Sequence, residues 1–214
     1  GEHDMADNIV HLVLARTPTA PEGVKGISLF VVPKFMVNAD GSLGDRNDAY
    51  CVSIEHKLGI HASPTAVMAY GDHGGAIGYL VGQENRGLEY MFIMMNAARY
   101  GVGLEGVADG ERAYQRAVTY ARDRIQGTDI GVRGGGKVAI INHPDVRRML
   151  MSMRSQVEAT RALAYVVGAA HDAAVHHPDP EVKKQNQAFV DLMIPVVKGW
   201  STETGNAMSY LGVQ

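Results

Sequence analysis

The hydrophobic pattern of this chain changes near residue 85. Between residues 9 and 81, short apolar runs rich in β-branched and aromatic residues are separated by turns that contain Gly, Pro, Asn or Asp. No helical pattern lies between these runs, so we expect a largely antiparallel sheet that forms a small barrel or sandwich. The predicted strands lie within residues 9–15, 26–32, 49–55, 66–70 and 76–81.

Beyond residue 85, apolar residues recur at steps of three and four, which is the period of an amphipathic α-helix. The pattern predicts a first helix over residues 88–126. A second helix opens at Asn142 or His143, where a proline and an aspartate fit the first turn, and it ends near the run HHPDP. A third helix opens at Asp179, a favourable N-cap residue, with Pro180 next.

Each of the last two helices has a predicted inward face. For the second helix this face is Val146, Met149, Met153, Val157, Leu163 and Val167, and for the third it is Val182, Phe189, Leu192, Val196 and Trp200. Three helices of roughly 30 to 40 residues indicate an up-down bundle whose fourth helix comes from another subunit or is missing from this chain. We therefore predict an α+β fold, with a β domain over residues 1–84 and a helical bundle over residues 85–214.

Composition and charge exclude several classes of protein. The chain has 20 basic and 23 acidic residues and a net charge of -3, so it has no overall positive field to attract nucleic acid. The single cysteine, Cys51, rules out an internal disulfide and fits a cytoplasmic protein. No apolar run approaches the roughly 18 residues of a membrane span. Because the chain of 214 residues begins with Gly1, we expect it to be an internal segment of a longer protein.

Arg124 is the first candidate for a functional role, in the stretch VTYARDRIQG at the end of the first predicted helix. In one interpretation, this cation neutralises the carbonyl end of its own helix and Gly127 is the stop signal. In the other, the planar guanidinium faces a partner and binds a phosphate in bidentate fashion. The spacing alone leaves both open.

Other polar groups are expected to have structural roles. The glycine-rich run 131–137 lacks the spacing of a phosphate-binding loop and predicts a flexible connection between helices. His171, His176 and His177 have no carboxylate or cysteine cluster beside them, so we predict no metal site. Four charges of the first helix, namely Glu105, Asp109, Arg112 and Arg116, predict a surface crossed by salt bridges.

Several stretches together resemble one family. KGISLFVVPK, HKLGIHASPT, GYLVGQENRGLEYMF and NHPDVRRML are similar, in this order and spacing, to the middle strand domain and following helices of the flavin-dependent acyl-CoA dehydrogenases. Within that family the chain is most similar to the longer bacterial branch that includes methylthiopropanoyl-CoA dehydrogenases. The resemblance covers practically all 214 residues and implies an FAD-dependent oxidoreductase of fatty acid metabolism that acts on an acyl-CoA thioester.

The resemblance also implies which residues bind FAD. A bundle arginine of the family reaches the cofactor's pyrophosphate in a neighbouring subunit, and Arg124 stands at that place. Gln126 replaces a hydroxyl residue of the family, His143 falls near the adenine-side contacts, and Gln214 matches the glutamine of a loop that meets FAD. The implied partners are further copies of the chain, as a homodimer or homotetramer, and an electron-transfer flavoprotein as electron acceptor.

No catalytic residue is predicted within the chain. The family's usual base is a glutamate in a later Tyr-Glu-Gly motif, expected beyond Gln214, and an alternative position is here Ala98, which cannot take a proton. We therefore expect a desaturase whose isolated segment is inactive. The alternatives are an acyl-CoA oxidase on the same scaffold and a non-catalytic, truncated binding or assembly module.

Overall fold

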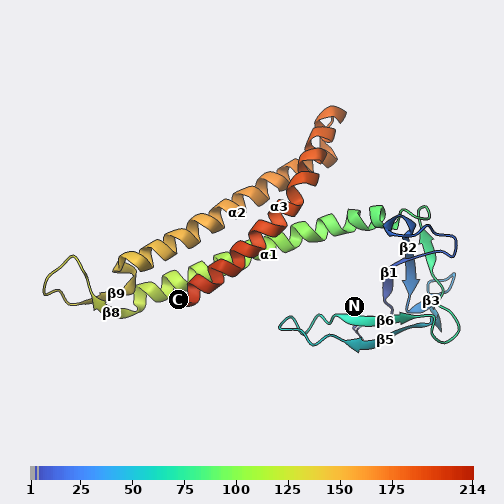
Figure 1. Cartoon of the computed structure of the whole chain (residues 1–214), viewed down its shortest axis with the longest axis horizontal. Coiled ribbons are helices and arrows are strands. Elements are labelled where there is room, and N and C mark those ends of the chain that lie inside the picture. Colours follow the sequence, from blue (N-terminus) through green and yellow to red (C-terminus); the bar gives the residue numbers. More distant parts are fainter. Residues whose placement is uncertain (1–2, 4) are drawn as a thin grey trace. The chain divides into compact units, whose positions relative to one another are not determined.

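The computed structural model describes residue 3 and residues 5–214. Antiparallel strands occupy the first part of the chain and three long helices the second, which confirms the predicted α+β class (Figure 1). The chain folds as two compact units, one ending at residue 94 and the other covering residues 95–214.

The first unit consists of short antiparallel ladders. One three-stranded sheet has the order β1-β2-β7, and β3 pairs with β4 as β5 does with β6. Each of the five predicted runs contains an observed strand. The strands β3 and β4 were not predicted, because they lie in a segment rich in turn residues. The strands are β1 (Val10–Ala15), β2 (Ser28–Pro33), β3 (Phe35–Val37), β4 (Leu43–Arg46), β5 (Ala49–Ile54), β6 (Ala66–Tyr70) and β7 (Tyr79–Val81), with a 3-10 turn, η1, at Val24–Gly26.

A buried asparagine holds this unit together. The side-chain amide of Asn47 donates to the carbonyls of Pro33 and Ile77, each at 2.8 Å, and its oxygen accepts from the amide of Ile77 at 2.9 Å. These bonds satisfy backbone groups at the end of β2 and just before β7, where no ladder would pair them.

The second part of the chain contains α1 (Gly87–Asp123), α2 (Pro144–His176) and α3 (Pro180–Val213). The predicted starts of α2 and α3 are confirmed. His143 is the N-cap residue of α2 and makes no side-chain capping bond, whereas the carboxylate of Asp179 accepts from the amide of Glu181 at 2.9 Å and caps α3. None of the helices in the described part of the chain combines the length and apolarity that a membrane span needs.

The bundle core consists mainly of α2 and α3 residues. Ala164 and Val167 of α2 pack with Val190, Ile194 and Val197 of α3, and a second cluster contains Met153, Val157 and Met208. The predicted α2 face is right at its centre, since Met153, Val157 and Val167 are buried.

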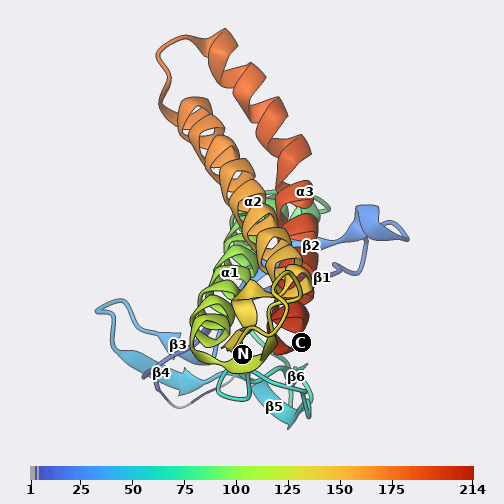
Figure 2. The same cartoon turned by 90° about the vertical axis from the view of Figure 1, so that its left-hand side faces the viewer.

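The predicted inward face of α3 is wrong. Phe189, Leu192, Val196 and Trp200 are exposed, and the buried face is instead rich in small residues, including Ser201, Thr204 and Gly205. Small residues are needed there because α1 and α3 approach closely: a Cβ on Gly106 would clash with the carbonyl of Ser201, and a Cβ on Gly205 with that of Gly106. Figure 2 shows α1, α2 and α3 side by side in this region.

Candidate functional site

Arg124 lies immediately after α1, with its backbone held on both sides. Its amide donates to the carbonyl of Tyr120 at 2.8 Å, and its own carbonyl accepts from the amide of Ile140, also at 2.8 Å. The chain between α1 and α2 forms a hairpin of β8 (Ile125–Thr128) and β9 (Lys137–Ala139), followed by a 3-10 turn, η2 (Ile140–Asn142). The glycine-rich run 131–137, predicted to connect the helices, lies mainly in the loop of this hairpin, and of that run only Lys137 belongs to a strand.

The guanidinium of Arg124 is exposed and donates to the side-chain oxygen of Gln126 at 3.2 Å. Within the described residues, no carboxylate lies within ion-pair distance of it. Arg124 thus carries its charge at the carbonyl end of α1, as the first interpretation requires, and keeps that charge free for an external anion, as the second requires.

His143 is tied to the same turn. Its Nε2 lies 2.7 Å from the carbonyl oxygen of Gln126 and, because a carbonyl can only accept, Nε2 carries the proton. Gly127 has a φ of 74°, and a Cβ there would meet the His143 ring at 3.2 Å. The structure therefore brings Arg124, Gln126 and His143 together through direct bonds.

An apolar cavity of about 400 Å³ lies at the same end of the bundle. Its walls are mostly aliphatic and thioether side chains, and Tyr120 and Ile140, whose backbones bond to Arg124, are among them. Gln214 also lines it. The lining residues are Ala117, Tyr120, Ala121, Ile140, Val146, Met149, Leu150, Met153, Leu211, Gly212, Val213 and Gln214. Sequence analysis missed this cavity, although several of its residues belong to the predicted inward stripes.

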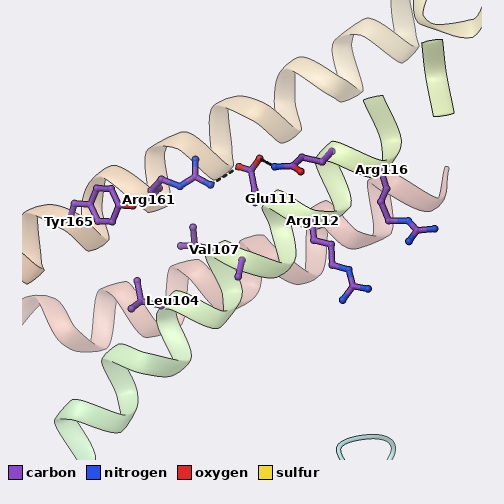
Figure 3. A pocket seen from close by; sticks show the side chains of 9 residues that line it. Leu104, Val107, Glu111, Arg112, Arg116, Arg161 and Tyr165 are labelled. Atoms are coloured by element: carbon purple, nitrogen blue, oxygen red, sulfur yellow. Dashed lines mark hydrogen bonds and ion pairs between the residues drawn. The ribbon is translucent and has the colours of Figure 1, made fainter. Parts of the chain in front are cut away.

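A second hollow, of about 530 Å³, lies between α1 and α2 (Figure 3). Arg161 of α2 donates to Glu111 of α1 at 2.5 Å across it, and Gln115 donates to the same carboxylate at 2.7 Å. These bonds lower the pKa of Glu111, with the Arg161 contact as the largest cause. Both charges of this pair are already neutralised within the chain, unlike that of Arg124.

The remaining candidates form no further site. In the part of the chain that the structure describes, no three His, Cys, Asp or Glu side chains gather as metal ligands. Ala98 is exposed on α1 and offers no proton acceptor. The expected salt bridges among Glu105, Asp109, Arg112 and Arg116 are absent from these described residues, so that expectation is wrong.

Comparison with known proteins identifies the class of protein to which this fold belongs. Residues 85–189 match the model of the acyl-CoA dehydrogenase C-terminal domain. The chain belongs to the acyl-CoA dehydrogenase family, whose members are FAD-dependent oxidoreductases. In particular, it is 56% identical over 214 residues to the 3-methylmercaptopropionyl-CoA dehydrogenase of Ruegeria pomeroyi, a match that covers 100% of this chain and 36% of that protein. The chain thus spans about a third of that relative's length.

Solved structures share the fold. ACDH-11 of Caenorhabditis elegans in complex with C11-CoA has a TM-score of 0.76 at 22% identity over 95% of this chain and 32% of that one. An acyl-CoA dehydrogenase of Bacillus anthracis complexed with FAD has a TM-score of 0.69 at 21% identity over 96% of this chain and 32% of that one.

Proposed function

We propose that the full-length protein is an FAD-dependent acyl-CoA dehydrogenase that introduces an α,β double bond into an acyl-CoA thioester, and that this chain supplies part of its cofactor site. The observation that carries the proposal is the exposed guanidinium of Arg124, which has no carboxylate partner among the described residues and whose backbone is fixed beside an apolar cavity of about 400 Å³. FAD combines a doubly charged diphosphate with flat ring systems, and this arrangement fits both parts. A guanidinium is the side chain best suited to bind phosphate oxygens in pairs.

We assign the diphosphate contact to Arg124, with the flavin nucleotide bound by a neighbouring subunit. We assign further cofactor contacts to Gln126 and His143, which lie at the same end of the bundle, and to Gln214, which lines the cavity. The residues present fit the cofactor on physical grounds, because an exposed cation without a described carboxylate partner is stabilised by an anionic ligand.

When bound, FAD accepts the β-hydrogen of the substrate as hydride and provides the redox chemistry. This chain contributes orientation, because the hydrogen bonds that fix the backbone of Arg124 limit where its guanidinium can reach. The α-proton needs a carboxylate base. We place that base outside this chain, since Ala98 has no such group.

Reductive titration of the full-length protein tests this proposal. The purified protein is expected to show the yellow spectrum of bound flavin, and anaerobic addition of a short acyl-CoA should bleach it. The 3-methylmercaptopropionyl thioester, for which the Ruegeria pomeroyi relative is named, is the first substrate to try. A flavin spectrum that no acyl-CoA changes would contradict the desaturase assignment.

The electron acceptor separates two functions on the same scaffold. We propose an electron-transfer flavoprotein, so turnover should require that acceptor or an artificial dye. Stoichiometric peroxide from air would instead show an acyl-CoA oxidase. A colourless protein that takes up no added FAD would favour a non-catalytic binding or assembly module.

A further inference from the structure

The turn between β3 and β4 contains an aspartate followed by a glycine, Asp40 and Gly41, in an exposed part of the hairpin that these strands form (Figure 2). Glycine has no side chain to shield its amide nitrogen, so an Asp–Gly pair is the aspartyl sequence most prone to close into a succinimide ring. The chain contains one other such pair, Asp109–Gly110, inside α1. The two pairs therefore differ in their structural surroundings.

Ring closure makes and breaks defined bonds. The amide nitrogen of Gly41 loses its proton and attacks Cγ of Asp40, a C–N bond forms, and the C–OH bond of the carboxyl group breaks so that water leaves. Water then opens the ring. Attack at the former side-chain carbonyl restores aspartate, and attack at the former main-chain carbonyl gives isoaspartate. No electrons are exchanged, and water is the only co-reactant, so the reaction needs a free amide and a protonated carboxyl group.

The native turn engages both of these groups. The amide of Gly41 donates to the carbonyl of Asn38 at 2.9 Å. One carboxylate oxygen of Asp40 accepts from the amide of Ser42 at 3.0 Å and from the Ser42 hydroxyl at 2.6 Å. The hydroxyl bond is the largest cause that lowers the pKa of Asp40, followed by the amide bond. The turn thus keeps the amide proton in place and the carboxyl group ionised, which opposes ring closure on both sides.

Asn38 fixes the position of the Ser42 hydroxyl. The side-chain amide of Asn38 donates to that hydroxyl at 3.0 Å and to the carbonyl of Leu43 at 3.3 Å, and its backbone amide donates to the carbonyl of Ser42 at 2.9 Å. The hydroxyl therefore accepts from Asn38 while it donates to Asp40. Removal of this one oxygen breaks both contacts.

The hairpin is a small structure that can open by itself. β3 has three residues and β4 has four, and their register shifts between Phe35 and Val37. Short exposed ladders open at a lower free energy than core elements do. Asp109–Gly110 instead lies within a helix of 37 residues, where Gly110 is buried. The Asp40–Gly41 pair should therefore become reactive first.

We propose that Asp40 is the site of isoaspartate formation in this chain, and that the Ser42 hydroxyl preserves it as aspartate while the hairpin is closed. Isoaspartate would add a methylene group to the backbone of the turn, so the bond between the Asn38 amide and the Ser42 carbonyl would be lost. The modification would then keep the hairpin open. This proposal is independent of the cofactor assignment.

Ageing of the full-length protein at neutral pH tests the proposal. Isoaspartate at both Asp–Gly pairs is measured by enzymatic methylation of digested peptides and by electron-transfer fragmentation, which distinguishes the two isomers. A free peptide of residues 36–46, sampled until half of it has isomerised, gives the rate without the turn. The parent protein should isomerise at Asp40 roughly tenfold or more slowly than the peptide, and at Asp109 more slowly still.

A serine variant tests the turn itself. Ser42→Ala removes the hydroxyl and leaves the backbone bond, so Asp40 should isomerise about two- to tenfold faster than in the parent. Free peptides with and without this substitution should react alike. Ser155→Ala is the matched control, because it removes an exposed hydroxyl on α2 that bonds the carbonyl of Ser152, and it should leave the rate at Asp40 unchanged.

Equal rates in the parent protein and the free peptide would overturn the proposal, because the turn would then give no protection. Equal rates in parent and Ser42→Ala protein would also overturn it, since any protection would come from another part of the full-length protein. Faster isomerisation at Asp109 than at Asp40 would place the site in α1 instead.

Discussion

At the scale of single residues, the turn after α1 depends on one histidine and one glycine. The carbonyl of Gln126 accepts from His143, and the positive φ of Gly127 lets the imidazole ring lie against the backbone. Gln126 and His143 both use polar atoms within the chain, so we propose that any effect they have on a ligand passes partly through the position of Arg124.

Gly127→Ala should loosen this turn. An alanine in the left-handed region costs roughly 1–2 kcal/mol, and its Cβ would press on the His143 ring. Amide hydrogen exchange at Ile140, which bonds the carbonyl of Arg124, should become about five- to thirty-fold faster. Gly134→Ala is the matched control, because Gly134 has a φ of 71° but nothing within 4 Å of its Cβ position. Equal exchange at Ile140 in parent and Gly127→Ala protein would show that the contact with His143 does not hold the turn.

The Glu111–Arg161 pair predicts a pH dependence. The guanidinium of Arg161 and the amide of Gln115 hold the pKa of Glu111 below its usual value of 4.5. A carboxyl with a lowered folded pKa adds stability above its unfolded pKa and loses it as pH falls through the folded value. Because both side chains are partly exposed, Glu111→Gln should cost only about 1 kcal/mol at neutral pH.

Urea unfolding of Glu111→Gln and parent protein between pH 3 and 7 measures this effect. The two free energies should differ near pH 7 and converge as the pH falls below 4.5. Glu203→Gln, at an exposed site on α3, should show no such convergence. A constant difference across the whole range would mean that the charge of Glu111 plays no part.

At the scale of elements, the contact between α1 and α3 depends on glycines, which have no side chain to keep the two backbones apart. Gly106→Ala would place a methyl group against the backbone of Ser201, and overpacking of this kind costs about 1–3 kcal/mol. The thermal midpoint of the bundle should therefore fall. Gly199→Ala, where a Cβ has open space, should instead stabilise α3 by roughly 0.5–1 kcal/mol. If both variants raised the midpoint, the close approach of the two helices would be disproved.

The sequence predicts these elements unevenly. Helix starts follow from Asp179 and from the proline after His143, because capping and first-turn preferences are local. The buried face of α3 does not follow, since its large apolar residues are exposed and the core side contains Ser201 and Gly205. A stripe of large apolar residues predicts the buried face of a helix only where that face is packed with large side chains. Where two helix backbones approach closely, small residues occupy the buried face instead. The β8–β9 hairpin also does not follow from local patterns, because it pairs residues that are nine or more positions apart in the sequence.

At the scale of the whole molecule, the sequence predicts that Arg124 is a cation at a helix end but does not predict the surroundings of its side chain. The apolar cavity forms only when three helices and η2 converge, and no local pattern reports that convergence. Likewise, the sequence predicts a surface crossed by salt bridges from Glu105, Asp109, Arg112 and Arg116, whereas these side chains form no ion pair among the described residues. The chain spans 36% of the length of its 56% identical relative.

The affinity of the full-length protein for FAD, compared between parent and Arg124→Ala, tests the central claim most directly. Loss of a charge-assisted bond to the diphosphate should cost about 1.5–3 kcal/mol, which corresponds to roughly ten- to 150-fold weaker binding. Arg122→Ala, which removes another exposed cation from the last turn of α1, should bind FAD as the parent does. If a correctly folded Arg124→Ala protein retained FAD with the parent's affinity, Arg124 would not be the diphosphate contact.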